Sequence, residues 1–488
     1  MTKNHSGKII GRAAELALLE KLYKSKNAEF LAVYGRRRIG KTFLITEYFK
    51  DKGVFFEVTG APKTTTKDQL HNFHDEFCAL FKTENRLAPP KNWQEAFRRL
   101  REAVKAIKPS QKVVLFFDEL PWLAAPRSKF LAALDYNWNR HFSRMPNVLL
   151  IVCGSAAAWM VNEILNDKGG LYGRLSAHLR LAPFTLFETE AYLYAQGIHL
   201  PKAQIAELYM VTGGVPKYLS YLEPGLSAAQ CVDALCFTPQ APLLTEFHKL
   251  YHSLFKHPEP HLKIIKALAQ KRHGLSRKEL LQEAGMRESG RASEILNELL
   301  ESGFLMMLPE VGKQTRESRY YLSDEYSLFY LNWIDPIKAN ILQGVDANYW
   351  LAKHHSQSWR IWAGFAFETL CLKHIDKIKS ALGISAVLTT VGYWKFIVKG
   401  KKEAEIDLVL ERADQCCNLS ELKFYSSVYE MTAQEAQDFA RKKELFRVRT
   451  GTRKALFTTL VTTFGAKKNS AYLASIDNQV TLEQLFIP

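Results

Sequence analysis

Short apolar runs alternate with helical patterns along the first third of this 488-residue chain. Such runs, separated by helices, are typical of strands that a parallel sheet buries on both faces. The pattern predicts four strands of one α/β sheet, at residues 30–34, 54–58, 113–117 and 148–153. After about residue 190 the strand pattern stops. The chain is then predicted to form helices that Gly213, Gly214 and Pro216 interrupt.

Residues 262–308 contain three short helical patterns, and a turn-containing segment follows them up to residue 322. This order predicts a winged helix-turn-helix with a two-stranded wing. The third helical segment carries four glutamates against one arginine, namely Glu288, Glu294, Glu298, Glu301 and Arg291. Because phosphates repel so acidic a helix, we favour an interdomain packing role over the reading of DNA sequence. The mildly basic wing could still touch a DNA backbone.

From about residue 351 the pattern returns to mixed α/β. We expect helices at 359–376 and 432–445, and strands at 386–398, 405–411, 419–425 and 455–462. The predicted domains are a nucleotide-binding core at 1–190, a helical lid at 191–255, a winged helix-turn-helix at 256–325, a linker at 326–350 and an α/β domain at 351–488.

The formal net charge of the chain is +16. An excess of positive charge favours polyanionic partners such as nucleic acid. The seven cysteines form no C-x-x-C pair, so neither a disulfide framework nor a zinc ribbon is indicated. No run approaches the roughly 18 apolar residues of a membrane span, and the first residues lack the apolar core of a signal peptide. We therefore expect a soluble cytoplasmic protein.

One stretch after the first apolar run has the spacing G-x-x-x-x-G-K-[ST], typical of the loop that cradles phosphates in nucleotide hydrolases. Its residues are Gly35, Arg36, Arg37, Arg38, Ile39, Gly40, Lys41 and Thr42. Lys41 is predicted to reach the β- and γ-phosphates of ATP, and the Thr42 hydroxyl to ligate Mg²⁺. A turn without a ligand fits the strand–loop–helix context less well. The three arginines are not required by the cradle, so either solvent or nucleic acid could surround them.

The third apolar run ends in the acidic pair Asp118 and Glu119. A buried strand can present a carboxylate at its C-terminal end, beside the phosphate loop. We assign Asp118 to hold hydrated Mg²⁺ and Glu119 to accept a proton from the attacking water. The alternative is an acidic pair that caps a helix. The phosphate loop favours the catalytic interpretation.

Six segments in this order resemble the bacterial and archaeal ATPases of the AAA-related, STAND-like group of P-loop proteins. They are IIGRAAEL, GRRRIGKT, FFDELPWL, CGSAAAWM, GGLYGRL and GGVPKYL. The resemblance covers about residues 8–250 and continues toward the C-terminus. It implies an ATP-hydrolysing core followed by a helical lid.

The same resemblance implies roles for further residues. Ser155 would sense the γ-phosphate, and Arg174 would act as an arginine finger toward a neighbouring subunit or domain. Gly213, Gly214 and Pro216 would belong to a helical-domain element that contacts the nucleotide. From the residues alone, a strand-ending serine, a surface arginine and a helix break are equally simple interpretations.

A second set of chemically active residues lies near the C-terminus. Alternation in EIDLVL puts Ile406, Leu408 and Leu410 on one face of a strand and Glu405 with Asp407 on the other, while Glu421 and Lys423 share a face of the next strand. If these strands pair, Asp407 and Glu421 could bind Mg²⁺ or Mn²⁺, and Lys423 could position or deprotonate a water. A hairpin with a solvated polar face is the alternative. Glu368, in the gap of an apolar helical face, favours the active site.

This order of a helical glutamate, an aspartate and E-x-K resembles the PD-(D/E)xK nuclease superfamily, over about residues 350–488. The resemblance implies a restriction-endonuclease-like domain, in which Gln434 or Gln437 would be an accessory polar residue. We therefore hypothesise an ATP-dependent switch that controls a nuclease-like domain on DNA, without sequence specificity. The alternative is a signalling or scaffold switch whose C-terminal domain binds nucleic acid or protein without cleaving.

Overall fold

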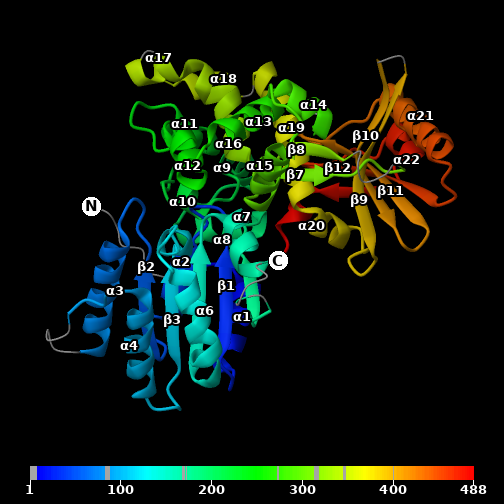
Figure 1. The fold of residues 1–488 in the computed structure, drawn as a ribbon. Coiled ribbons are helices and arrows are strands. Elements are labelled where there is room, and N and C mark those ends of the chain that lie inside the picture. Colours follow the sequence, from blue (N-terminus) through cyan, green and yellow to red (C-terminus); the bar gives the residue numbers. More distant parts are fainter. Residues whose placement is uncertain are drawn as a thin grey trace. The chain divides into compact units, whose positions relative to one another are not determined.

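The computed structural model describes residues 8–82, 88–166, 171, 173–271, 274–312, 318–344, 348–354, 356–398 and 401–488. The chain divides between Ala182 and Pro183 into two compact units (Figure 1). No helix among the described residues is both long enough and apolar enough to cross a membrane.

A five-stranded sheet forms the centre of the first unit. Its strands are β1 (Glu29–Tyr34), β2 (Val54–Thr59), β3 (Val113–Asp118), β4 (Val148–Gly154) and β5 (Ala177–Arg180). They lie in the order β2-β3-β4-β1-β5, and all neighbours are parallel. The four expected strands are confirmed. β5 was not predicted, because it is only four residues long and alternates between partly and fully exposed positions.

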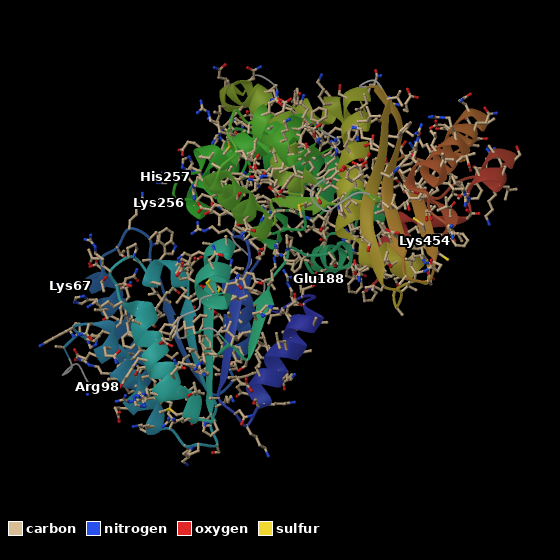
Figure 2. The ribbon with its side chains drawn as sticks, turned by 45° about the vertical axis from the view of Figure 1, so that its right-hand side comes forward. Lys67, Arg98, Glu188, Lys256, His257 and Lys454 are labelled. Atoms are coloured by element: carbon tan, nitrogen blue, oxygen red, sulfur yellow. The ribbon has the colours of Figure 1, made fainter. Side chains whose placement is uncertain are left out.

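Helices cover both faces of this sheet. They are α1 (Ala13–Lys24), α2 (Lys41–Phe49), α3 (Thr66–Phe81), α4 (Trp93–Lys105), α5 (Leu120–Leu123), α6 (Phe130–Arg140) and α7 (Ala157–Met160). Leu31 and Val33 of β1 pack with α1 and α2, whereas Phe30 and Ala32 pack with α3, α4 and α6. The strand is apolar throughout because both of its faces are buried. Exposed cations such as Lys67 and Arg98 lie on α3 and α4 (Figure 2).

The second unit begins with a set of helices. They are α8 (Leu186–Ala195), α9 (Lys202–Thr212), α10 (Pro216–Leu219), α11 (Ala228–Cys236) and α12 (Glu246–Leu254). α9 ends at Gly213 and Gly214, both with positive φ angles, and α10 starts at Pro216. The predicted helical segment and its interruption are therefore confirmed.

Three more helices pack beside a small sheet. The elements are α13 (Glu259–Gln270), β6 (Leu275–Ser276), α14 (Arg277–Glu283), α15 (Gly290–Glu301), β7 (Leu305–Leu308) and β8 (Arg319–Leu322). The expected helices and strands are present, and the tip of the expected wing, residues 313–317, lies outside the described residues. Beyond β7, the Val311 N–H donates to Tyr393 O at 2.9 Å, and the Tyr393 N–H donates to Pro309 O at 3.2 Å. The chain after β7 therefore pairs with a strand of the C-terminal sheet.

The segment expected to be a linker is an aromatic packing region. It contains α16 (Glu325–Phe329), α17 (Lys338–Gln343) and α18 (Tyr349–Lys353). Phe329, Trp333 and Trp350 are buried there, and Trp350 contacts each of the other two through an edge-on ring pair. Such pairs stabilise a core beyond the burial of their area.

The C-terminal region is a mixed sheet with flanking helices. Its elements are α19 (Gln357–Lys373), α20 (Ile375–Ala381), β9 (Thr389–Val398), β10 (Lys401–Arg412), β11 (Cys416–Lys423), α21 (Ala433–Thr450), β12 (Ala455–Thr462), α22 (Ser470–Ser475) and β13 (Asn478–Thr481). The strand order is β13-β12-β11-β10-β9. β10 is antiparallel to both neighbours, whereas β11, β12 and β13 are parallel. The expected strands and helices are confirmed; the short β13 was not predicted.

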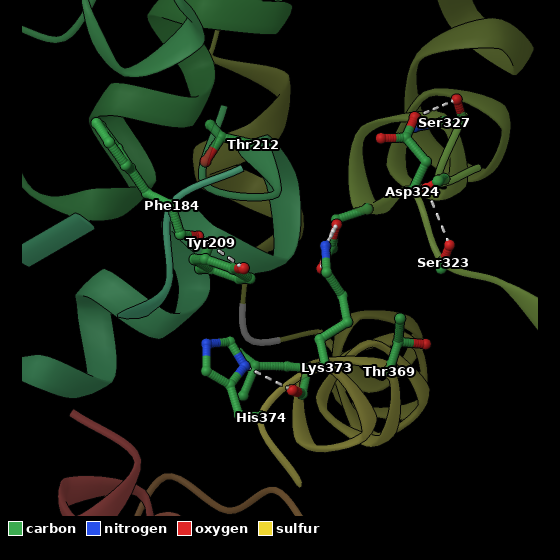
Figure 3. Close-up of polar contacts among 12 residues, drawn as sticks. Phe184, Tyr209, Thr212, Ser323, Asp324, Ser327, Thr369, Lys373 and His374 are labelled. Atoms are coloured by element: carbon green, nitrogen blue, oxygen red, sulfur yellow. Dashed lines mark hydrogen bonds and ion pairs between the residues drawn. The ribbon is translucent and has the colours of Figure 1, made fainter. Parts of the chain in front are cut away.

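One continuous apolar cluster runs from Phe184 to Phe486. A buried ion pair is set into it: Lys373 Nζ donates to both carboxylate oxygens of Glu325, at 2.8 Å each. Burial raises the pKa of Glu325, which is 1% exposed. A Cβ at Gly213 would lie 2.6 Å from Glu325 Oε2, so the end of α9 packs directly on this pair. Figure 3 shows Lys373 and its neighbours Tyr209 and His374 at this junction.

His374 holds the start of α8 to the end of α19. Its Nε2 accepts from the Leu186 N–H at 3.1 Å, so Nδ1 carries the hydrogen and donates to Leu370 O at 2.8 Å. Burial lowers the pKa of His374 to about 4. The imidazole is therefore neutral in the folded protein at neutral pH.

Candidate functional site

The predicted phosphate loop connects β1 to α2. Gly35 has a φ of +143°, and a Cβ there would lie 2.4 Å from Leu181 O. Gly40 has a φ of +87° at the N-terminus of α2. Both positions need glycine because of their positive φ angles, and Gly35 needs it also because Leu181 O approaches so closely. The loop ends at a helix N-terminus, whose N–H groups attract anions.

Lys41 is the cation at the centre of this loop. Its Nζ donates to Gly35 O and Arg36 O, at 2.9 Å each, and to Ser155 Oγ at 3.0 Å. Burial lowers the pKa of Lys41. A buried ammonium held mainly by neutral carbonyl and hydroxyl oxygens favours an anionic partner, and a phosphate would supply one.

Ser155 connects Lys41 to the acidic pair. β4 lies between β1 and β3 in the sheet, so the residue that follows it stands between the loop after β1 and the carboxylates after β3. Ser155 accepts from Lys41 and donates its hydroxyl proton to Glu119 Oε1 at 2.7 Å. The strand order therefore brings three predicted site residues into one chain of hydrogen bonds.

Asp118 lies beside Thr42. The Thr42 hydroxyl donates to Asp118 Oδ2 at 2.5 Å, and the Glu119 N–H donates to Asp118 Oδ1 at 2.8 Å. Asp118 is buried at the end of β3. A carboxylate and a hydroxyl in contact are oxygen donors of the kind that Mg²⁺ prefers, so this pair fits the ion that accompanies ATP.

The other loop residues are arranged around this centre. Arg36 and Ile39 are buried, whereas Arg37 and Arg38 are half-buried. The structure adds Arg12, whose buried Nη2 donates to Ile39 O at 3.3 Å. Arg12 has a positive φ and follows Gly11, which also has one. In the sequence, the only sign of this role was the Gly11-Arg12 pair before the first helix. The contact itself could not be predicted, because Arg12 and Ile39 are 27 residues apart.

Arg174 is exposed, in a turn where its N–H donates to Leu171 O at 3.0 Å. Among the described residues, its side chain has no hydrogen bond to Lys41, Asp118 or Glu119. Gly213, Gly214 and Pro216 lie in the second unit, at the end of α9 and the start of α10. The roles that the resemblance implies for these residues stay predictions.

The second candidate site is built on β10 and β11, which pair as expected. β10 has a bulge between Ile406 and Val409. Ile406 and Val409 consequently pack in one apolar cluster, and Leu408 with Leu410 in another. The prediction that Ile406, Leu408 and Leu410 share a face is wrong, because the extra residue reverses the alternation. Asp407 lies at the bulge.

Asp407, Glu421, Lys423 and Glu368 influence one another electrostatically. Burial and repulsion by Asp407 raise the pKa of Glu368. Burial and repulsion by Glu421 raise the pKa of Asp407 to about 7. Burial lowers the pKa of Lys423, but attraction by Glu421 and Asp407 outweighs it and leaves that pKa raised. A raised pKa favours the protonated form of the Lys423 side chain.

Glu421 is held by two lysines. Lys442 Nζ of α21 donates to Glu421 Oε1 at 2.7 Å, and Lys423 Nζ lies 3.6 Å from Glu421 Oε2. Lys442 was not predicted; it stands in α21, where Gln434 or Gln437 was expected to contribute, and both glutamines are exposed. Asp407 and Glu421 are suitable oxygen donors for Mg²⁺. No three His, Cys, Asp or Glu side chains in the described part of the chain are arranged to hold one metal ion.

Comparisons with known proteins identify an ATPase domain in the N-terminal part of the chain. Residues 9–222 match the model of a family described as an ATPase domain predominantly from Archaea. An uncharacterized protein of Methanocaldococcus jannaschii is 24% identical over 405 residues, which are 82% of this chain and 83% of that protein. The chain therefore carries an ATPase domain of the P-loop type.

Solved structures resemble the chain in fold. A Walker-type ATPase of Pyrococcus abyssi aligns with a TM-score of 0.51 and 19% identity, over 68% of this chain and 98% of that one. The ORC2 protein of Aeropyrum pernix, solved in ADPNP and ADP complexes, aligns with a TM-score of 0.46 and 15% identity, over 70% of this chain and 97% of that one. The five-stranded parallel sheet is thus a fold shared with the Pyrococcus ATPase.

Proposed function

We propose that this protein hydrolyses ATP and uses the nucleotide to control a nuclease-like domain that acts on DNA. The hydrogen-bond chain from Lys41 through Ser155 to Glu119 carries the first part of the proposal, because it joins a phosphate-binding cation to a carboxylate base. The pairing of β10 with β11 carries the second part, because it brings Asp407, which accepts from the Leu422 N–H at 3.0 Å, beside Glu421.

In the first site, the contacts of Lys41, Thr42, Asp118, Glu119 and Ser155 support the roles given to them here, whereas the role of Arg174 rests on the resemblance to the ATPase group. Lys41 binds the β- and γ-phosphates, and Thr42 with Asp118 would hold Mg²⁺. Glu119 accepts the proton of the attacking water, and Ser155 responds to the γ-phosphate between them. We assign Arg174 the arginine-finger role, in cis or from a neighbouring subunit.

In the second site, Asp407 and Glu421 would hold Mg²⁺ or Mn²⁺. A divalent ion there would supply the positive charge that stabilises the scissile phosphate. Lys423 binds a phosphate oxygen or orients the water, because its raised pKa favours these roles over removal of the proton. Lys442 and Lys423 hold the Glu421 carboxylate in place.

A second candidate function is a switch without nuclease chemistry. Both oxygens of Glu421 already face lysines, an arrangement that a purely structural ion-pair network would also have. In that case the C-terminal region would bind nucleic acid or a protein without cutting.

The test measures ATP turnover and DNA cleavage by the full chain with Mg²⁺ or Mn²⁺. Lys41→Ala should abolish ATP turnover, and Glu119→Gln should lower it by about 10² to 10⁴-fold. Asp407→Ala should abolish cleavage of linear, circular, branched and single-stranded DNA. Asp414→Asn, which changes a carboxylate paired with Arg412 on the same sheet, is the matched control and should cleave normally.

The two parts of the proposal can fail separately. ATP turnover that survives Lys41→Ala would contradict the first part. Absence of cleavage in the wild type, while ATP turnover persists, would contradict the second and favour the switch. Cleavage that depends on ATP in the wild type but not in Lys41→Ala would support control by the nucleotide.

A further inference from the structure

A groove with a volume of about 1680 Å³ opens within the second unit. It is lined by α9, the N-terminal part of α11, α19, and the ends of β11 and β12. Glu368 and Lys423 both line it, so the groove leads to the second candidate site. A molecule lying in the groove would reach Glu368 and Lys423, the two members of that site that line it.

One wall of the groove is a single face of α19. The lining residues repeat at helical spacing: Gln357, Arg360, Ile361, Gly364, Phe365 and Glu368. A Cβ at Gly364 would contact no atom within 4 Å, so close packing does not require this glycine. Its small size lowers the wall and keeps the groove open above Glu368.

The floor carries two exposed aromatic side chains. In the parallel ladder, Lys423 pairs with Thr462 at the ends of β11 and β12. Tyr425 and Phe464 lie two residues beyond these ends, and the Tyr425 N–H donates to Thr463 Oγ1 at 3.1 Å. Their exposed fractions are 42% and 47%. Two aromatic rings are thus exposed to solvent just beyond the ends of the neighbouring strands β11 and β12.

The charged side chains around these two rings indicate which kind of molecule the groove could bind. Lys202 and Glu483 are paired in the lining, as are His354 and Glu207. Arg360 is exposed, and the described part of the chain gives it no ion pair. Lys423 already lies 3.6 Å from Glu421, so Arg360 is the cation of this lining that the described part of the chain leaves without an ion pair. An occupant must therefore offer flat apolar faces to the aromatic floor and negative charge to Arg360. In duplex DNA the flat faces of the bases are stacked on one another and are not accessible. A single strand presents a base face and a negatively charged phosphate at every nucleotide.

We propose that this groove binds a single-stranded segment of nucleic acid, with bases stacked on Tyr425 and Phe464 and phosphates near Arg360. The inference rests on the proposed nuclease function and narrows its substrate class. The cleaved strand would enter unpaired, along the face of α19 that ends at Glu368.

The test measures binding without cleavage, by fluorescence anisotropy of the full chain in EDTA. The probes are a labelled DNA single strand of about 15 nucleotides and the duplex of the same sequence. We expect tighter binding of the single strand. Tyr425→Ala and Phe464→Ala should each raise its Kd by roughly 5- to 100-fold, the range that stacking of one base represents. Tyr425→Phe, which keeps the ring, should restore wild-type affinity.

Tyr194→Ala is the matched control, because Tyr194 is an exposed aromatic residue of α8 outside the groove lining, and it should bind like the wild type. Thermal unfolding of each variant checks that it is folded. Equal affinity for the single strand and the duplex would overturn the inference, and so would an affinity that neither alanine variant changes. Binding of peptides but not of nucleic acid in the groove would also overturn it. Binding with these properties in a protein that never cuts would overturn only the proposed nuclease function.

Discussion

Glu119 has a left-handed backbone conformation, with a φ of 47° at the end of β3. This conformation costs a residue with a side chain about 1 to 2 kcal/mol. Its N–H is held by Asp118 and its carboxylate by Ser155, so the surrounding hydrogen bonds maintain the conformation. Backbone strain of this kind concentrates at functional sites. The same residue that we propose as the base is therefore the one that the fold holds in an uncommon conformation.

His374 gives a prediction about pH at the scale of one residue. Burial lowers its pKa from 6.5 to about 4. The unfolded chain therefore takes up a proton as pH falls through 6.5, while the folded chain resists until about 4. The neutral imidazole therefore contributes its full stabilisation above pH 6.5, and this contribution decreases as the pH falls below 6.5. Between about pH 7 and pH 5 the wild type should lose about 2 kcal/mol of unfolding free energy through this residue.

His374→Gln keeps an acceptor for the Leu186 N–H but does not titrate. Urea unfolding of both proteins at several pH values should show a flatter profile for the variant. Parallel profiles would show that His374 is already charged in the folded protein or does not govern acid stability.

At the scale of elements, the junction of α9, α16 and α19 depends on close approach. Gly213 ends α9 with a φ of +63° and lies against the Glu325 carboxylate, whose oxygens are both held by Lys373. The carboxylate cannot swing away without breaking a buried ion pair, a loss that is strongly destabilising.

Gly213→Ala should therefore lower the free energy of unfolding by about 2 to 4 kcal/mol, through both the strained φ and the contact with Glu325. Gly383→Ala is the matched control, because Gly383 has a φ of +70° but open space around its Cα. The control should lose about 1 kcal/mol, from the conformation alone. If urea unfolding shows the same loss of free energy in both variants, the Glu325 side chain moves away from the new methyl group at little cost.

Prediction from the sequence succeeded where local pattern decides the structure. The four long strands of the first sheet and the phosphate loop follow from apolar runs and fixed spacing. β5 and β13 were missed because four residues carry too little periodicity. The bulge at Asp407 and the contacts of Arg12 and Lys442 depend on pairing between distant segments, which a local pattern cannot reveal.

At the scale of the whole molecule, the division at Ala182 separates the sheet unit from everything that follows. The helices after Pro183, the small sheet and the C-terminal sheet share one apolar cluster. They should therefore unfold together, and residues 183–488 should respond to force or heat as one unit.

Calorimetry of the full chain should consequently show two unfolding transitions. A nonhydrolysable ATP analogue with Mg²⁺, at about 100 times its Kd, should raise one transition by roughly 5 to 10 °C, because it binds the folded first unit. Lys41→Ala should remove this shift and leave the other transition in place. A single transition in the absence of nucleotide would show that the two units are strongly coupled.

The pairing of the chain after β7 with β9 has a consequence for solubility. β9 is the outer strand of its sheet, and an uncovered outer strand can recruit a strand of another molecule. The backbone at Pro309 and Val311 satisfies the N–H and C=O groups of Tyr393, and Gly392 lets Pro309 O approach closely. The segment after β7 thus blocks this part of the edge, which guards concentrated protein against strand exchange and aggregation there.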